Sequence, residues 1–333
     1  MAPGSEGLIT APPKSGPLSV PADRDLHVNV LILNKKKKGH TLKQTHLAHN
    51  TRDLQAGAAG AAAEREVAAA KWKREKSRNW SERKISSIST GSGEPVGRMI
   101  KVGSNIDAYL AEAPPAHTAR KDHGILFLPD VGGIGHNCKL MADSFAALGY
   151  TTLMPDLFDG DSVPRDRTTS TSIIDWINHG VPGKHPHTTQ YVDPVVVAAI
   201  RAMRDLGLAK IAAVGYCFGA KAITNQYVVR HYKSGIDVGF IAHPSLVEED
   251  ELRAITGPLS IAAAERDEIF PTDMRHKSEG ILVGTGQPYQ ISLYGGVEHG
   301  FAVRCNEEIP VERFARDQAF RQAAAWFDEW LSR

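Results

Sequence analysis

The chain has 333 residues, of which 42% are hydrophobic, 7% aromatic and 23% charged. This composition excludes full-length disorder, and three cysteines exclude a scaffold built on disulfides. The formal net charge of +1 averages two unlike segments, because residues 1–84 hold 16 of the 39 Lys and Arg but only 8 of the 38 Asp and Glu. The first segment is therefore strongly basic and the rest of the chain is acidic.

Residues 1–85 are predicted to form a basic, largely disordered N-terminal extension. Met1–Ala22 is rich in Gly, Pro and Ser, and such segments bury too little apolar surface to offset chain entropy. The apolar run Val28–Leu33 is too short for a membrane span or a signal peptide. We therefore expect a cytoplasmic protein with no membrane or nucleic-acid partner. Two alternatives remain open: a nuclear-localisation tract or basic arm at Lys35–Lys38, and a misassigned gene start.

Residues 86–333 are predicted to form one α/β domain. Two short alternating runs, Met99–Val102 and Ile106–Ala111, predict an N-terminal antiparallel hairpin. Apolar strands then alternate with helices, which indicates a mainly parallel central sheet with helices on both faces. The predicted strands are Gly124–Leu128, Thr151–Met154, Lys210–Gly215, Val238–Ala242, Leu259–Ala264 and Gln290–Tyr294. The predicted helices are Cys138–Leu148, Pro194–Leu206, Ala220–His231 and Val311–Leu331.

The loop Gly215-Tyr216-Cys217-Phe218-Gly219 joins a predicted strand directly to a predicted helix. This is the nucleophile-elbow pattern with cysteine in the place of the nucleophile. Its glycines let the strand and the helix pass closely, and the helix N-terminus lowers the pKa of a thiol. A small packing cysteine between strand and helix is the structural alternative.

Two later loops follow strands in the same way. Asp267 lies in the loop after Leu259–Ala264, where an acid can orient a histidine, and His299 lies between glycines after the last predicted strand. Most acids and histidines in such loops have no catalytic role. The order nucleophile, acid, histidine, with each residue after a strand, is nevertheless that of α/β-hydrolases. The sequence therefore predicts the triad Cys217, Asp267 and His299.

At these residues the chain resembles the dienelactone hydrolase (carboxymethylenebutenolidase) family, which has the α/β-hydrolase fold. The resemblance covers about three quarters of the chain, from about Ser86 onward. It is carried by the elbow, by the Arg266-Asp267 loop and by His299-Gly300-Phe301-Ala302-Val303-Arg304. Two upstream segments also match, Leu128-Pro129-Asp130-Val131-Gly132-Gly133 and Met154-Pro155-Asp156-Leu157-Phe158.

The resemblance implies that Cys217 attacks an ester or lactone carbonyl, forms an acyl-enzyme and is regenerated by water, without a cofactor. The backbone N–H groups of Phe218 and Val131 are the expected oxyanion hole. In the family, a glutamate and arginines surround the thiol and the substrate carboxylate. Here the corresponding loop has Asp130 in place of the glutamate. Arg304 is either a carboxylate-binding residue or part of a structural ion pair. The candidates for substrate binding are Asp130, Tyr216, Trp176, Phe270, Phe301 and Arg304.

Residues 159–193 form a long polar connection, which predicts either a lid carrying Trp176 or a helix docked on the domain. His179, His185 and His187 match no metal-ligand spacing, so we expect no metal. The predicted function is a small-molecule lactone or ester hydrolase, monomeric or homodimeric. The alternatives are a thioesterase or lactonase tailoring step in natural-product biosynthesis and a catalytically silent ligand-binding protein.

Overall fold

The computed structural model describes residues 93–115, 120–163, 172–224 and 235–331. Three expectations lie outside these residues: the extension over 1–85, its boundary with the domain, and the part of the predicted helix Ala220–His231 beyond Thr224. Within the described part of the chain, every helix is too short or too polar to cross a bilayer.

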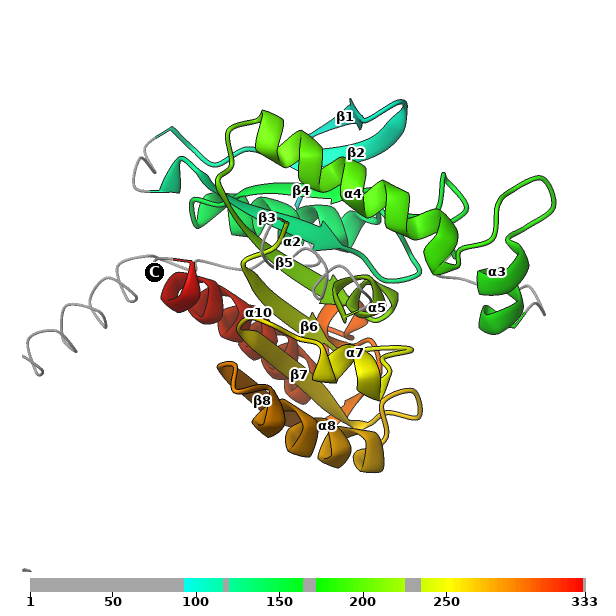
Figure 1. Cartoon of the computed structure of the whole chain (residues 1–333), viewed down its shortest axis with the longest axis vertical. Coiled ribbons are helices and arrows are strands. Elements are labelled where there is room, and N and C mark those ends of the chain that lie inside the picture. Colours follow the sequence, from blue (N-terminus) through cyan, green and yellow to red (C-terminus); the bar gives the residue numbers. More distant parts are fainter. Residues whose placement is uncertain (1–92, 116–119, 164–171, 225–234, 332–333) are drawn as a thin grey trace, which may run out of the picture. The chain divides into compact units, whose positions relative to one another are not determined.

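One sheet of eight strands organises the domain, in the order β1-β2-β4-β3-β5-β6-β7-β8. β1 and β2 form the antiparallel hairpin, β2 is also antiparallel to β4, and the remaining neighbours are parallel. The mainly parallel sheet and the N-terminal hairpin are thereby confirmed (Figure 1). The strands are β1 Arg98–Val102, β2 Ile106–Ala111, β3 His123–Leu128, β4 Thr151–Pro155, β5 Lys210–Tyr216, β6 Val238–Ala242, β7 Leu259–Arg266 and β8 Tyr289–Glu298.

Helices cover both faces of this sheet, as the alternation of strands and helices predicted. The described helices are α2 His136–Ala147, α3 Ile173–His179, α4 Thr189–Asp205, α5 Phe218–Thr224, α7 Glu249–Arg253, α8 Thr272–Thr285, α9 Phe301–Arg304 and α10 Pro310–Trp330. Two buried cores result. One lies between the sheet and α3, α4, α5, α7 and α8, and the other between the sheet and α2, α9 and α10.

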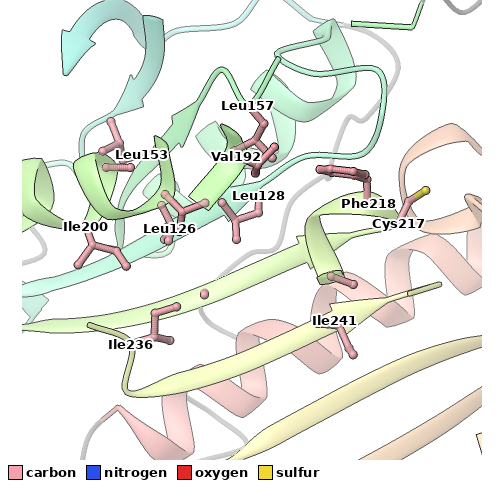
Figure 2. Packing of buried hydrophobic residues seen from close by; sticks show 14 of the residues in the cluster. Leu126, Leu128, Leu153, Leu157, Val192, Ile200, Cys217, Phe218, Ile236 and Ile241 are labelled. Carbon is pink, nitrogen blue, oxygen red and sulfur yellow. The ribbon is translucent and has the colours of Figure 1, made fainter. Parts of the chain in front are cut away.

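The two cores follow from the pleat of the strands, because successive side chains point to opposite faces. In β3, Leu126 and Leu128 enter the first core, whereas Ile125 and Phe127 enter the second. Figure 2 shows the first core reaching from Ile236 to Cys217 at the end of β5. The packing of this core therefore extends up to the predicted nucleophile.

Two boundaries of the described elements differ from the sequence prediction by more than two residues. α4 begins at Thr189 and contains Pro194 in its interior, because its buried stripe already starts at Val192. β8 continues through Glu298, four residues beyond the predicted end at Tyr294. The glycine pair that suggested a loop is part of this strand, and Gly296 takes up an irregular conformation with φ of +76°. His299 therefore follows directly on a strand residue.

The polar helix α8 was not predicted from the sequence. It buries Arg275, Ser278 and Leu282, so its inward face has little of the apolar periodicity that identifies an amphipathic helix. The residue that follows it, Gly286, adopts the left-handed conformation that commonly ends helices.

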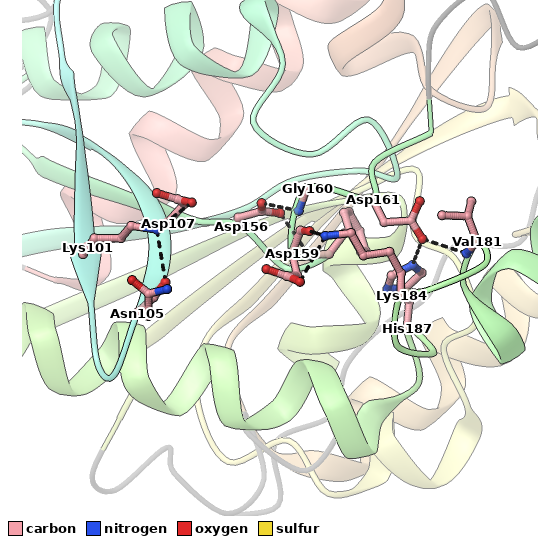
Figure 3. Close-up of polar contacts among 11 residues, drawn as sticks. Lys101, Asn105, Asp107, Asp156, Asp159, Gly160, Asp161, Val181, Lys184 and His187 are labelled. Carbon is pink, nitrogen blue, oxygen red and sulfur yellow. Dashed lines mark hydrogen bonds and ion pairs between the residues drawn. The ribbon is translucent and has the colours of Figure 1, made fainter.

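The described part of the 159–193 connection packs against the domain, as in the docked-helix alternative. Trp176 of α3 is 4% exposed, and its ring lies 5.0 Å from the ring of Phe158. Asp161 connects the segment: its carboxylate contacts His187 Nε2 at 2.8 Å and accepts the Val181 N–H, and its carbonyl accepts the Trp176 indole N–H. Figure 3 shows the Asp161 contacts with Val181 and His187 beside the Lys184–Asp159 pair.

The second core provides a test of the fold with a matched control. Phe145 of α2 is fully buried, and its ring lies 4.5 Å from that of Phe320 on α10. Phe145→Ala should lower the free energy of unfolding by about 3–5 kcal/mol, because it leaves a cavity between the two helices. Phe314→Ala removes the same atoms from an exposed position on α10 and should cost under about 0.5 kcal/mol. Equal losses in denaturant titrations would contradict this packing.

Candidate active site

The Cys217 backbone occupies a sharp turn between β5 and α5. Its φ of +52° lies in the left-handed region, which is unfavourable for a residue with a side chain. Hydrogen bonds hold the turn: the Cys217 N–H donates to the Ala242 carbonyl, and the Cys217 carbonyl accepts the N–H groups of Ala220 and Ser245. The turn therefore has the nucleophile-elbow conformation that the sequence predicted.

Gly219 is required by a close approach of two backbone segments. A Cβ at this position would collide with the Leu128 carbonyl oxygen and would lie 2.8 Å from the Pro129 carbonyl oxygen. The start of α5 thus packs directly on the end of β3. This brings Phe218, the first residue of α5, near the loop that contains Val131.

Strand pairing brings the predicted acid and histidine together. Arg266 of β7 pairs with Glu298 of β8, across a register shift that follows Ala264. Asp267 and His299 directly follow these two paired residues, so the ladder itself places them side by side. The exposed Arg266–Glu298 ion pair, at 3.3 Å, spans the same position.

The three predicted triad residues form one chain of contacts. Cys217 Sγ lies 3.1 Å from His299 Nε2, and His299 Nδ1 lies 2.9 Å from Asp267 Oδ2. Asp267 is held in turn by the backbone N–H groups of Ile269 and Phe270, each 2.9 Å from Oδ1. Because both Asp267 oxygens are hydrogen-bonded, the carboxylate and the imidazole have a defined orientation.

The electrostatics of Cys217 and His299 favour opposite charges. Burial alone would raise the pKa of the Cys217 thiol, but hydrogen bonding and charge from His299, with a further hydrogen bond from Ser245, bring this pKa below its usual value. Burial alone would lower the pKa of His299. The contacts with Asp267 and Cys217 outweigh burial and raise the His299 pKa to about 9. The arrangement therefore supports a thiolate beside an imidazolium.

The loop after β6 adds two residues that the sequence analysis missed. Ser245 Oγ lies 3.2 Å from Cys217 Sγ and 3.4 Å from His299 Nε2. The His243 ring lies 5.1 Å from that of His299 and is fully buried. The signal was available, because His243-Pro244-Ser245 directly follows a buried strand, as Asp267 does.

A cavity of about 510 Å³ adjoins the loop after β3. It is lined by Asp130 and Val131, by the N-terminal turn of α2, by Ser162, Val163 and Ile173, and by Val303 and Arg304. Arg304 Nη1 lies 3.0 Å from Asp130 Oδ2, so these two predicted binding residues form an ion pair on the cavity wall. The Asp130 charge also acts to raise the pKa of Cys217, against the larger effects of His299.

The other predicted binding residues are buried rather than on the wall of this cavity. Tyr216 is 1% exposed and packs on Phe127 in the second core, where burial raises its pKa well above the usual value. Phe301 packs on Tyr294, and Phe270 lies in the first core. Trp176 packs on Phe158, as described above. A direct substrate contact by these four aromatic residues stays a prediction.

Comparison with known proteins agrees with this geometry. The family model of the dienelactone hydrolase family matches residues 106–331. Hydrolase pyvD of Aspergillus violaceofuscus is 46% identical over 72% of this chain and 93% of its own length. Hydrolase tropI of Talaromyces stipitatus is 44% identical over 72% of this chain and 92% of its own length.

A solved structure shows the same fold at low identity. The dienelactone hydrolase-like promiscuous phosphotriesterase from metagenomic libraries is 15% identical and has a TM-score of 0.56, covering 72% of this chain and 99% of its own. The resemblance to the family and the α/β-hydrolase architecture are therefore confirmed. The chain belongs to the dienelactone hydrolase family and is a hydrolase of the kind that acts on esters or lactones.

Proposed function

We propose that Cys217, His299 and Asp267 form a catalytic triad that hydrolyses a small-molecule ester or lactone through an acyl-enzyme. The observation that carries this proposal is the Cys217–His299 contact at 3.1 Å, with His299 oriented on its other nitrogen by Asp267. A nucleophile, a base in hydrogen-bond reach and a third group that orients the base are the parts that covalent acyl transfer requires.

Acylation begins with attack of the Cys217 thiolate on the carbonyl carbon, and the carbonyl electron pair moves onto oxygen. The imidazolium of His299 then donates its Nε2 proton to the leaving alkoxide as the carbon–oxygen bond breaks. The product is a thioester on Cys217 and an alcohol. With a lactone, this alcohol stays attached to the acyl group.

Deacylation reverses the role of His299. The neutral imidazole takes a proton from water, and the resulting hydroxide attacks the thioester carbon. The thiolate leaves, so the acyl group departs as a carboxylic acid and the imidazolium is restored. Asp267 accepts the Nδ1 hydrogen bond throughout, which keeps Nε2 directed at the sulfur.

The backbone N–H groups of Phe218 and Val131 are our candidates for stabilising the oxyanion. Phe218 begins α5, and N–H groups in a first helical turn have no carbonyl partner within the helix. Val131 lines the cavity beside the end of β3, which Gly219 brings against α5. Two such donors on neighbouring backbone segments are typical of hydrolases that form tetrahedral intermediates.

The cavity wall favours a substrate with an acidic group. Arg304 is about one third exposed, at 33%, and one of its guanidinium nitrogens already contacts Asp130. The planar guanidinium has five N–H donors, so it can hold Asp130 and a substrate carboxylate together. We therefore infer that Arg304 positions acyl substrates that carry a carboxylate.

Removing the sulfur should abolish turnover. Cys217→Ala is expected to lower kcat for an activated ester by about 10⁴-fold or more, because the acyl-enzyme cannot form. Cys217→Ser should retain a small residual activity, since His299 can activate a hydroxyl. In intact-mass spectra after rapid quenching, the wild-type chain should gain the acyl mass on Cys217.

Cys305→Ser is the matched control for this experiment. Cys305 lies outside the triad, where its sulfur accepts a hydrogen bond from Arg316, so the variant should keep nearly all activity. If Cys217→Ala hydrolyses the ester at the wild-type rate, the nucleophile assignment is wrong. If neither the wild type nor Cys305→Ser hydrolyses any ester or lactone of a broad panel, the site is a silent binder.

Ser245→Ala should shift the pH dependence of hydrolysis. kcat/KM should rise as Cys217 loses its proton below the usual thiol value, and fall as His299 loses its proton at about 9. Ser245 donates to the sulfur and stabilises the thiolate, so its removal raises the pKa of Cys217 and moves the acidic limb to higher pH. If kcat/KM of the variant falls at every pH and the acidic limb stays at the same pH, this positioning role of Ser245 is contradicted.

Arg304→Gln tests the substrate class. For an aryl ester that carries a carboxylate, KM should rise about 10–100-fold, the value of a lost charge-assisted hydrogen bond. For the matching ester with an uncharged amide, KM should change little. Arg321→Gln replaces an exposed arginine of α10 and serves as the control. An equal rise for both esters would show that Arg304 only supports the fold.

A further inference from the structure

Cys217, His243 and His299 form a cluster that the proposed hydrolysis does not fully use. One potential ligand atom from each, the sulfur and one ring nitrogen of each histidine, lies within 4.8 Å of the other two. Hydrolysis as described requires only Cys217 and His299 of this set. The position and chemistry of His243 therefore call for a separate explanation.

His243 is buried without a hydrogen-bond partner. It is 0% exposed, and neither ring nitrogen has a partner among the described residues. Leaving a buried polar group unpaired destabilises the folded state, so such groups are rare in folded proteins. The rings of Tyr216 and Phe301 lie 6.1 and 5.7 Å away, and neither residue hydrogen-bonds the imidazole. The His299 ring lies nearer, at 5.1 Å, and Cys217 completes the cluster.

The backbone holds this side chain in place. His243 has a φ of +36°, a conformation that few residues with side chains adopt. Its N–H donates to the Ala262 carbonyl, which fixes the loop to β7. The fixed backbone therefore keeps the imidazole within ligand distance of Cys217 and His299.

One thiolate and two imidazoles are a donor set that suits Zn²⁺. Soft sulfur and borderline nitrogen ligands select zinc over Mg²⁺ or Ca²⁺, and zinc sites combine Cys and His ligands in tetrahedral geometry. Bond lengths of about 2.0–2.3 Å place tetrahedral ligand atoms about 3.4–3.6 Å apart. The distance of 3.1 Å between Cys217 Sγ and His299 Nε2 is close to this range. Binding therefore requires movement mainly of the His243 side chain.

The surroundings of His299 also match a metal ligand. Its Nδ1 is hydrogen-bonded to Asp267, and zinc-binding histidines commonly donate their second nitrogen to a carboxylate in this way. The His299 side chain is 14% exposed, so an ion can reach the cluster from solvent. A water molecule would complete four-coordination.

We propose that Cys217, His243 and His299 bind a thiophilic divalent cation, Zn²⁺, and that the bound ion reversibly blocks hydrolysis. The ion takes a lone pair from the sulfur and from one nitrogen of each imidazole, and the proton of the Cys217–His299 pair is released to solvent. No electron transfer is involved. This inference goes beyond the proposed function, because it depends on the positions of three side chains and not on an acyl-enzyme.

The binding experiment uses the full chain, freed of metal with a chelator and kept without added thiols. Titration with ZnCl₂ in a calorimeter should show one site per chain, and MgCl₂ should give no heat. Co²⁺ in place of Zn²⁺ should produce a thiolate-to-cobalt charge-transfer band. Zinc should also protect Cys217 from alkylation by iodoacetamide and inhibit ester hydrolysis, with recovery on addition of EDTA.

His243→Asn separates this site from the triad. Asn tolerates the left-handed conformation of residue 243, so the loop should keep its shape while zinc affinity falls about tenfold or more. His243→Phe keeps the ring volume and provides a second variant. His276→Asn, at an exposed position of α8, is the matched control and should bind zinc as the wild type does.

Three results would overturn the proposal. In the first, the wild-type chain does not bind zinc. In the second, it binds the metal, but the Co²⁺ complex has no thiolate-to-cobalt band. In the third, zinc inhibits the wild type and both His243 variants equally. None of these results tests the proposed triad, which is tested separately by the hydrolysis rate of Cys217→Ala. Conversely, zinc binding with no hydrolysis of any ester would support the metal site and contradict the proposed function.

Discussion

The contact between the Cys217 sulfur and the His299 ring depends on the parallel sheet. β5, β7 and β8 run in the same direction, so their carboxyl ends meet at one edge and bring together residues separated by 82 positions in the chain. The elbow supplies the sulfur, and the β7–β8 ladder supplies the acid and the imidazole as adjacent residues. The helices on both faces keep this edge in register by burying the strands in two cores.

The charge state of this contact results from opposing effects. Burial disfavours both the thiolate and the imidazolium, yet each ion stabilises the other over 3.1 Å, and Asp267 adds a negative charge behind the histidine. Asp130 works against the thiolate, and its ion pair with Arg304 moderates that effect. A substrate carboxylate that engages Arg304 would thus alter the field at the sulfur as well as occupy the cavity.

Much of the fold and the predicted triad could be read from the sequence, because both rest on local patterns. Fully apolar strands identify a parallel sheet, and residues that follow such strands lie at one edge. Ser245 and His243 satisfy the same rule, but no motif singles out a serine and a histidine beside a proline. The helix α8 and the end of β8 were missed because their sequences lack the expected periodicity. Long-range pairs such as Asp130–Arg304 depend on tertiary packing that spacing does not encode.

We infer that Cys217 and His299 exist as a thiolate–imidazolium pair in the resting protein. The most direct measurement is the pH titration of thiolate absorbance in the near ultraviolet, taken as the difference between the wild type and Cys217→Ala. Cys217 should ionise below the ordinary thiol value, and the signal should change again as His299 loses its proton at about 9. A single titration at or above the ordinary thiol value would contradict it.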